Sequence, residues 1–193
     1  MGTIFVDNLE PQSGTTLTLG ASGDTVTLTT GAKTSGFGKI GQVVSVTKTD
    51  TFSTASTSYT DLTGMSLSIT PSSTSSKILL STQISFGGSK SLYSFARFMR
   101  DSTAISIGDT GESNQKRASF PMDNPNATDD IYKAKNSAMT FLDTPSTTSS
   151  ITYKIQVVVR SGGTLDINRS NNNDNEPYNG RYVSSLTAME ILD

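Results

Sequence analysis

The 193-residue chain contains no histidine, no cysteine and no tryptophan. Without histidine, the sequence excludes Ser-His-Asp and Cys-His catalytic sites in their usual forms, and with them the common zinc enzymes. Without cysteine, it excludes disulfides and thiolate metal sites. Carboxylates remain, so composition alone leaves a glycosidase pair open. We therefore expect a protein that is not an enzyme and that holds no metal or cofactor.

Charged tracts and long apolar runs are also missing. The net charge is −2, and no Lys/Arg tract forms the basic footprint that nucleic-acid-binding proteins show. No apolar run approaches the roughly 20 residues that a membrane-spanning helix needs. The first residues lack the basic region and apolar stretch of a signal peptide. We therefore expect no nucleic-acid partner and no insertion into a membrane.

The chain is instead rich in serine and threonine, with 30 and 29 residues by direct count. Threonine suits the pleated, half-buried surface of a strand, whereas serine and glycine suit turns. From about Gly41 onward, apolar and polar residues alternate with a period of two, which is typical of strands with one buried face. No stretch keeps apolar residues at helical spacing. The pattern predicts an all-β protein, a sandwich or a barrel of about eight to ten short strands.

The clearest strand is 151–160, where the apolar residues at odd positions are expected to point inward. Met65, Leu67 and Ile69 share one face of another strand. The remaining expected strands are 78–86, 92–100, 165–168 and 181–192, with shorter ones at 42–48, 103–108 and 137–142.

Two segments interrupt this alternation. Residues 92–100 are apolar on both faces, which indicates either a strand covered on both sides or a contact between subunits. Arg97 and Arg100 lie among them, and a solvated face is favoured over pairing with acidic groups of an adjacent subunit. Residues 109–136 are polar and predict a long excursion over the surface.

The N-terminal segment, residues 1–38, carries three β-like pieces rich in threonine and glycine. Its apolar side chains are too few to form a core, and isolated strands of this kind are marginal. Three copies around a shared axis would bury these groups and pair the strand edges, whereas the alternative is a flexible tail. The candidate anchoring or stem residues are Ile4, Val6, Leu17, Leu19, Val26 and Leu28.

Three stretches resemble proteins of bacteriophage particles. TIFVDNLEPQSGTTLTLGASGDTVTL resembles the N-terminal segments of small virion and fibre proteins of phages, notably those of marine and cyanobacterial hosts. YTDLTGMSLSITPSSTSSKILLSTQISF and LDINRSNNNDNEPYNGRYVSSLTAMEIL resemble a C-terminal domain of phage tail-fibre proteins. That domain is similar in strand pattern to the trimeric jelly rolls of the tumour necrosis factor and C1q type. The resemblance implies a jelly roll at 39–193 after the N-terminal segment.

The resemblance also implies a role. The expected protein is a homotrimeric fibre or spike that belongs to the virion, is assembled in the host cytoplasm and attaches to another virion protein through residues 1–38. The short chain favours the alternative of a trimeric capsid decoration protein, whereas the C-terminal resemblance favours a fibre. A carbohydrate-binding module is disfavoured because such modules rely on tryptophan platforms. A glycan depolymerase would need a carboxylate pair that nothing in the sequence indicates.

The loop RSNNNDNEPYNG, residues 169–180, is the candidate receptor surface. Amide and carboxylate groups suit sugar hydroxyls, and a tyrosine offers a flat apolar face to a sugar ring or to a protein. An ordinary surface loop is the alternative, because asparagine is common in turns. Alternation of Asp166, Asn168 and Ser170 resembles a calcium loop, but later positions lack the required glycine and glutamate. The candidate contact residues are Asn171, Asn172, Asn173, Asp174, Asn175, Tyr178 and Arg181.

Overall fold

The computed structural model describes residues 39–89, 92–122, 130–160 and 163–192. The anchoring candidates Ile4, Val6, Leu17, Leu19, Val26 and Leu28 lie outside the described residues. The anchoring role of residues 1–38 and the domain boundary at residue 39 therefore stay predictions.

Within the described residues the protein is all-β, as expected. Every pair of adjacent strands is antiparallel. The elements are β1 (Ile40–Lys48), β2 (Phe52–Thr54), β3 (Thr60–Ile69), β4 (Lys77–Gly88), β5 (Ser94–Arg100), β6 (Thr103–Ile105), β7 (Phe120–Pro121), the 3-10 turn η1 (Asp130–Tyr132), β8 (Lys135–Asp143), β9 (Ile151–Val159), β10 (Leu165–Ile167) and β11 (Ser184–Ile191).

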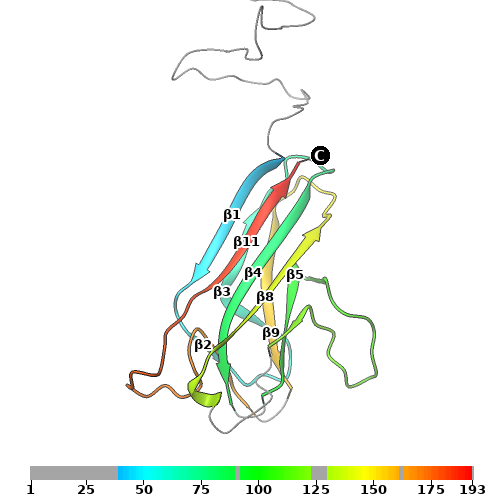
Figure 1. Ribbon diagram of the computed structural model, residues 1–193. Helices are drawn as coiled ribbons and strands as arrows, with labels where there is room; N and C mark the ends of the chain where they lie inside the picture. Colours follow the sequence, from blue (N-terminus) through cyan, green and yellow to red (C-terminus); the bar gives the residue numbers. More distant parts are fainter. Residues whose placement is uncertain (1–38, 90–91, 123–129, 161–162, 193) are drawn as a thin grey trace, which may run out of the picture. The chain divides into compact units, whose positions relative to one another are not determined.

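The strands form two sheets packed face to face. The first sheet has the order β1-β11-β4-β10-β2. Strands β11 and β10 pair with successive parts of one edge of β4, and β8 pairs with the opposite edge. The second has the order β3-β9-β5-β6, with β7 also beside β5. The main pairs are nested along the chain: β5–β6 is innermost, followed by β4–β8, β3–β9 and β1–β11 (Figure 1). A long hairpin rolled in this way is a jelly roll, which confirms the predicted fold class.

The core lies between the sheets and follows the alternation in the sequence. Met65, Leu67 and Ile69 are buried together, as predicted. The inward residues of β9 are also buried, namely Ile151, Tyr153, Ile155, Val157 and Val159. The expected surface excursion at 109–136 is only partly on the surface, because Phe120 and Met122 are buried in the core. Phe120 contacts the ring of Phe98, with 6.0 Å between ring centroids.

Arg100 does not lie on a solvated face. Its guanidinium donates from Nη1 to both carboxylate oxygens of Asp143 at 3.0 Å, and the buried Tyr153 hydroxyl donates to the same carboxylate at 2.6 Å. Burial and the neighbouring carboxylate both raise the pKa of Tyr153, so this hydroxyl stays protonated. Since Asp143 belongs to β8 and the other two residues to β5 and β9, this cluster ties the two sheets together.

Arg97 does lie on the outer face of the second sheet, and its contacts there are within its own chain. Its guanidinium carbon lies 3.8 Å from the centroid of the Tyr59 ring, and its Nη2 donates to Gln156 Oε1 at 2.7 Å. The structure therefore pairs both arginines inside one subunit, because cross-strand neighbours that the sequence does not reveal lie within reach.

The sandwich has two distinct ends. At one end, β1 begins beside the end of β11: Ile40 is paired with Ile191, and Leu192 N donates to Lys39 O at 2.7 Å. The long segment between β10 and β11, residues 168–183, lies at the opposite end (Figure 1). The nine residues of β1 separate the two ends by roughly 26 Å. The chain thus enters the domain far from the candidate receptor loop.

Glu190 fastens the turn between β3 and β4 to the first sheet. Burial raises the pKa of Glu190, but hydrogen bonds from Gln42 and from the Ser72 hydroxyl and backbone amide together lower it by more. The pKa therefore lies below the ordinary value of 4.5. Glu190 Oε1 accepts from Ser72 N at 2.6 Å, and Oε2 accepts from Gln42 Nε2 at 2.8 Å.

Replacing this carboxylate is expected to change the response of stability to acid. A lowered native pKa contributes stability that is complete well above pH 4.5 and is lost as the pH falls, since the unfolded chain takes up the proton first. We expect Glu190→Gln to reduce the free energy of unfolding by about 1–2 kcal/mol at pH 7. Urea unfolding at pH 7 and below pH 4 should show this difference shrinking in acid. An equal difference at both values would contradict the assignment.

Candidate functional site

The candidate receptor loop is built on a buried asparagine. Asn168 follows β10 directly, is fully buried and has a φ of 61°, a left-handed conformation that asparagine tolerates. Its Nδ2 donates to the carbonyls of Lys48 and Asp50 at 2.8 and 2.9 Å. Its Oδ1 accepts from the Ser184 hydroxyl at 2.6 Å, and the backbone N of Asn168 donates to Ser85 O at 2.8 Å. One side chain therefore joins the ends of β1 and β11 to β10.

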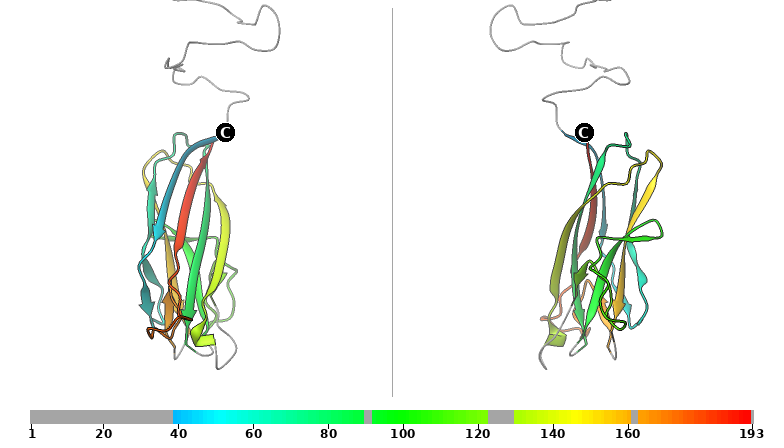
Figure 2. Two further views of the ribbon diagram at one scale, coloured as in Figure 1. Left: turned by 60° about the vertical axis from the view of Figure 1, so that its left-hand side comes forward. Right: turned by 90° about the vertical axis from the view of Figure 1, so that its right-hand side faces the viewer.

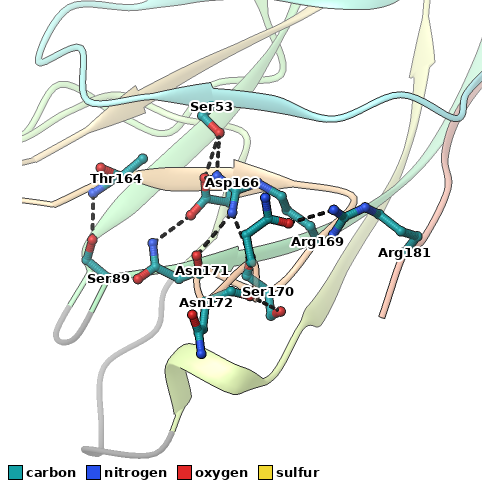
Figure 3. A network of polar contacts seen from close by, with 10 residues as sticks. Ser53, Ser89, Thr164, Asp166, Arg169, Ser170, Asn171, Asn172 and Arg181 are labelled. Carbon is teal, nitrogen blue, oxygen red and sulfur yellow. Dashed lines mark hydrogen bonds and ion pairs between the residues drawn. The ribbon is translucent and has the colours of Figure 1, made fainter. Parts of the chain in front are cut away.

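A buried ion pair forms the second part of the base (Figure 3). The carboxylate of Asp166 is fully buried and is paired with Arg169 Nη2. It also accepts from Ser53 Oγ at 2.6 Å and from Asn171 Nδ2 at 2.7 Å. Arg169 Nη1 donates to the carbonyls of Ser170 and Asn171 at 3.2 and 3.0 Å. The pair thus fixes the backbone of the first loop residues.

Gly87 in β4 allows this part of the loop to lie directly on the sheet. A Cβ atom at this position would come within 2.7 Å of Arg169 O, 2.8 Å of Ser170 Cα and 2.9 Å of Asn171 N. All three atoms belong to backbone, so no side-chain rotation relieves the clash.

Substitution of this glycine should displace the loop. We expect Gly87→Ala to lower the free energy of unfolding by about 2 kcal/mol, because overpacking forces the backbone of 169–171 away. Amide hydrogen exchange in this stretch should accelerate. Gly108→Ala is the matched control, since its Cβ would lie 3.8 Å from the nearest atom, Ala118 O. Equal effects of the two variants would contradict close packing at Gly87.

The outer part of the loop surrounds a polar depression of about 300 Å³. Arg181 Nη2 donates to Asn173 Oδ1 at 2.6 Å, and Asn179 Nδ2 donates to Asp174 O at 2.9 Å, so the walls are held by their own hydrogen bonds. The lining residues are Asn173, Asp174, Asn175, Glu176, Asn179 and Arg181. Amides, carboxylates and a guanidinium together offer both donors and acceptors to a polar ligand.

Two tyrosines stand beside each other at the same end. Tyr178 of the loop and Tyr132 of η1 are 56% and 38% exposed, and their rings meet edge to face with 5.4 Å between centroids. The two segments are also joined by backbone, because Asn172 N donates to Ile131 O at 2.8 Å. Exposed aromatic pairs of this kind provide an apolar surface next to polar groups.

The structure separates the seven candidate contact residues by environment. Asn173, Asp174, Asn175 and Arg181 line one depression, whereas Asn171 points its amide nitrogen inward at Asp166. The other two candidates contact η1: Asn172 through its backbone hydrogen bond to Ile131, and Tyr178 through its ring contact with Tyr132. No ligand tests these residues, and their contact role stays a prediction.

Sequence reasoning missed the base of the site and its second aromatic. Asp166, Asn168 and Ser170 are all fully buried, and their alternation places them on one inward face rather than around a calcium ion. That alternation was the available signal, because it continues the period of a strand. Tyr132 gave no such signal, since it is brought to Tyr178 only by the fold.

The comparisons with known proteins give a short result. No protein family matches the chain, and no curated protein matches it. Three solved structures of infectious bursal disease virus are similar in shape. The structure of the Gt strain has 16% sequence identity and a TM-score of 0.39, and the match covers 79% of this chain and 38% of that one. The VP2 subviral particle has 15% identity, a TM-score of 0.41 and coverages of 78% and 41%, and the Gx strain has 17% identity, a TM-score of 0.39 and coverages of 79% and 36%. The chain spans about two fifths of the length of those chains.

Two other kinds of site are absent from the described residues. In the part of the chain that the structure describes, no group of three or more acidic side chains is placed to hold a metal ion. Among the same residues, no helix is both long and apolar enough to cross a membrane. The groups present at the loop end are suited to hydrogen bonding and to apolar contact with a ligand.

Proposed function

We propose that this chain is a non-enzymatic structural protein of a bacteriophage virion. In this proposal it is a homotrimeric appendage of the fibre or spike type, attached to the particle through residues 1–38. Its jelly-roll loops bind a glycan or a protein on the host surface. The resemblance of the N-terminal segment and of the C-terminal stretch to phage proteins is the starting point, and the jelly-roll fold is consistent with it.

The opposite placement of the two ends is the observation that carries this proposal. The chain enters the domain at Lys39, beside the end of β11. The segment 168–183, which carries the depression and Tyr178, lies at the other end (Figure 1). Tyr132 of η1 joins it there through the ring contact with Tyr178. An appendage needs this polarity, because the surface that meets the host must lie away from the attachment. The rigid base formed by Asp166 and Asn168 supports it further, since a preorganised loop loses less entropy on binding.

Immunogold electron microscopy tests the proposal. Virus particles purified from a culture that carries this gene are labelled with an antibody raised against the full chain. Label on tails or on projecting fibres is the expected result. Absence of the protein from purified particles would refute a virion role.

The same images separate the fibre from the capsid decoration protein. Label spread over the head and absent from the tail would support decoration instead, because a decoration protein clamps neighbouring capsomers. The observation that favours a fibre is the aromatic and polar surface at the loop end, which a clamp does not require.

A further inference from the structure

The outer face of the first sheet carries no charge over three consecutive rows of side chains. In Figure 2, left, this sheet faces the viewer with β1, β11, β4 and β8 side by side. The register of the four strands defines the rows. The twelve residues of these rows, which we call the neutral face, are Val43–Met189–Leu79–Leu142, then Ser45–Thr187–Ser81–Thr140, then Thr47–Ser185–Gln83–Ala138. The protein as a whole is 17% charged, and none of these twelve positions carries a charged residue.

The first row of the neutral face is apolar from one edge of the sheet to the other. Val43 on β1 and Leu142 on β8 are 57% and 46% exposed, and Met189 and Leu79 between them are half-buried. In the described residues, β1 pairs only with β11 and β8 only with β4, so both are edge strands. The apolar row therefore ends on two different free edges. Contiguous exposed apolar rows of this kind mark interaction surfaces.

The outer face of the second sheet provides an internal comparison. Its residues include Asp61, Lys154 and Arg97, which are linked in a polar network. Lys154 Nζ lies 2.7 Å from Asp61 Oδ2, and this ion pair lowers the pKa of Asp61. A solvated sheet face in this protein thus carries charges. The neutral face lacks them, as the buried centre of a protein interface does.

We propose that the neutral face is the surface through which copies of this chain contact one another. A face without charge meets its own copy with no like charges opposed, which would not hold for the face of Asp61, Lys154 and Arg97. This inference rests on the homotrimer of the proposed function and names the surface that builds it.

The two ends of the apolar row determine the kind of contact. In a ring of three, each interface joins two different surfaces of neighbouring copies. The β8 edge with Leu142 of one copy then meets the β1 edge with Val43 of the next, and the row faces the threefold axis. Four strands about 4.8 Å apart and about 26 Å long present roughly 500 Å² per copy. Three such faces around the axis together remove roughly 1,500 Å² from solvent in the whole trimer.

Single charges introduced at the two ends of the row test this inference. The full chain and the variants Val43→Lys, Leu142→Lys and Ser68→Lys are compared by size exclusion with light scattering. Ser68→Lys is the matched control, because Ser68 is exposed near the end of β3, on the outer face of the second sheet. We expect the wild type and the control at three times 20.4 kDa, about 61 kDa, and both row variants at about 20 kDa, a threefold fall in mass. Circular dichroism shows whether each variant is folded.

The outcomes distinguish this inference from the proposal it rests on. A monomeric wild type overturns the homotrimer and this inference together. A trimeric wild type with trimeric row variants overturns this inference alone. Loss of the trimer in the control as well, or in one row variant only, would also overturn it, because a ring of unlike edges needs both ends of the row.

Cross-linking gives a second measurement that does not depend on the folding of lysine variants. The chain has no cysteine, so a Val43→Cys, Leu142→Cys double variant carries the only thiols. Disulfides need Cβ atoms about 3.5–4.5 Å apart. Under oxidation we expect covalent dimers and trimers from the double variant and a marked loss of both in each single variant. Monomer alone from a trimeric double variant would overturn the proposed meeting of the two edges.

Discussion

Asp166→Ala should unfold at markedly lower denaturant than the wild type, with a fall of about 3 kcal/mol in the free energy of unfolding, because it leaves the largely buried guanidinium of Arg169, 16% exposed, without its ion pair. The amide of Asn171 and the hydroxyl of Ser53 lose the same acceptor. The loop that begins at Arg169 then loses its attachment to β10. Guanidinium unfolding followed by tyrosine fluorescence measures the stability, and hydrogen exchange at 169–172 measures the release of the loop.

Asp174→Ala is the matched control for this variant. Asp174 is an exposed carboxylate in the same loop, so its removal is expected to change the unfolding free energy by less than about 0.5 kcal/mol. A similar loss in both variants would show that the effect comes from the charge of the loop and not from the buried pair. Unchanged stability of Asp166→Ala would refute a structural role for the Asp166–Arg169 pair.

Asp143→Ala is expected to have the second large effect, a fall of about 3 kcal/mol in the free energy of unfolding. The substitution leaves Arg100 and the buried hydroxyl of Tyr153 without an acceptor. These residues come from strands of both sheets, so the variant weakens the contact between the sheets themselves. Urea unfolding at pH 7 measures the loss.

Tyr153→Phe separates the parts of this cluster. This substitution removes only the hydroxyl and leaves the Arg100–Asp143 pair intact, so we expect the free energy of unfolding to fall by about 1 kcal/mol. A loss in Tyr153→Phe as large as that in Asp143→Ala would mean that the ion pair contributes nothing. In that case Arg100 would be held only by packing of its aliphatic stem.

The strands and the fold class follow from the sequence because their cause is local. Inward residues of a strand lie two positions apart, so Met65, Leu67 and Ile69 reveal their common face without any knowledge of the partner strand. The same is true of 151–159. The predicted strand ends differ from the observed ones by only a few residues, as for the predicted strand 181–192 and the observed β11 (Ser184–Ile191). The two-residue strand β7 was missed, because two residues carry no period.

The candidate loop was also visible in the sequence, since asparagine, aspartate and proline mark a turn wherever they gather. The sequence placed this segment on the surface, and Asn173, Asp174 and Arg181 gather in one depression. It did not reveal that Asn171 turns inward, because the acceptor Asp166 is reached only when the loop folds back.

Composition and period thus determined that the protein is a β sandwich without the residues of the common histidine and cysteine sites, and where its strands lie. The tertiary structure alone decided which polar groups are buried, which rows meet across the sheet and which ends face apart. Ser53 and Asp166 are 113 positions apart, and Val43 and Leu142 share one row through two intervening strands. Register between distant strands depends on all the side chains that pack together, so no local pattern contains it.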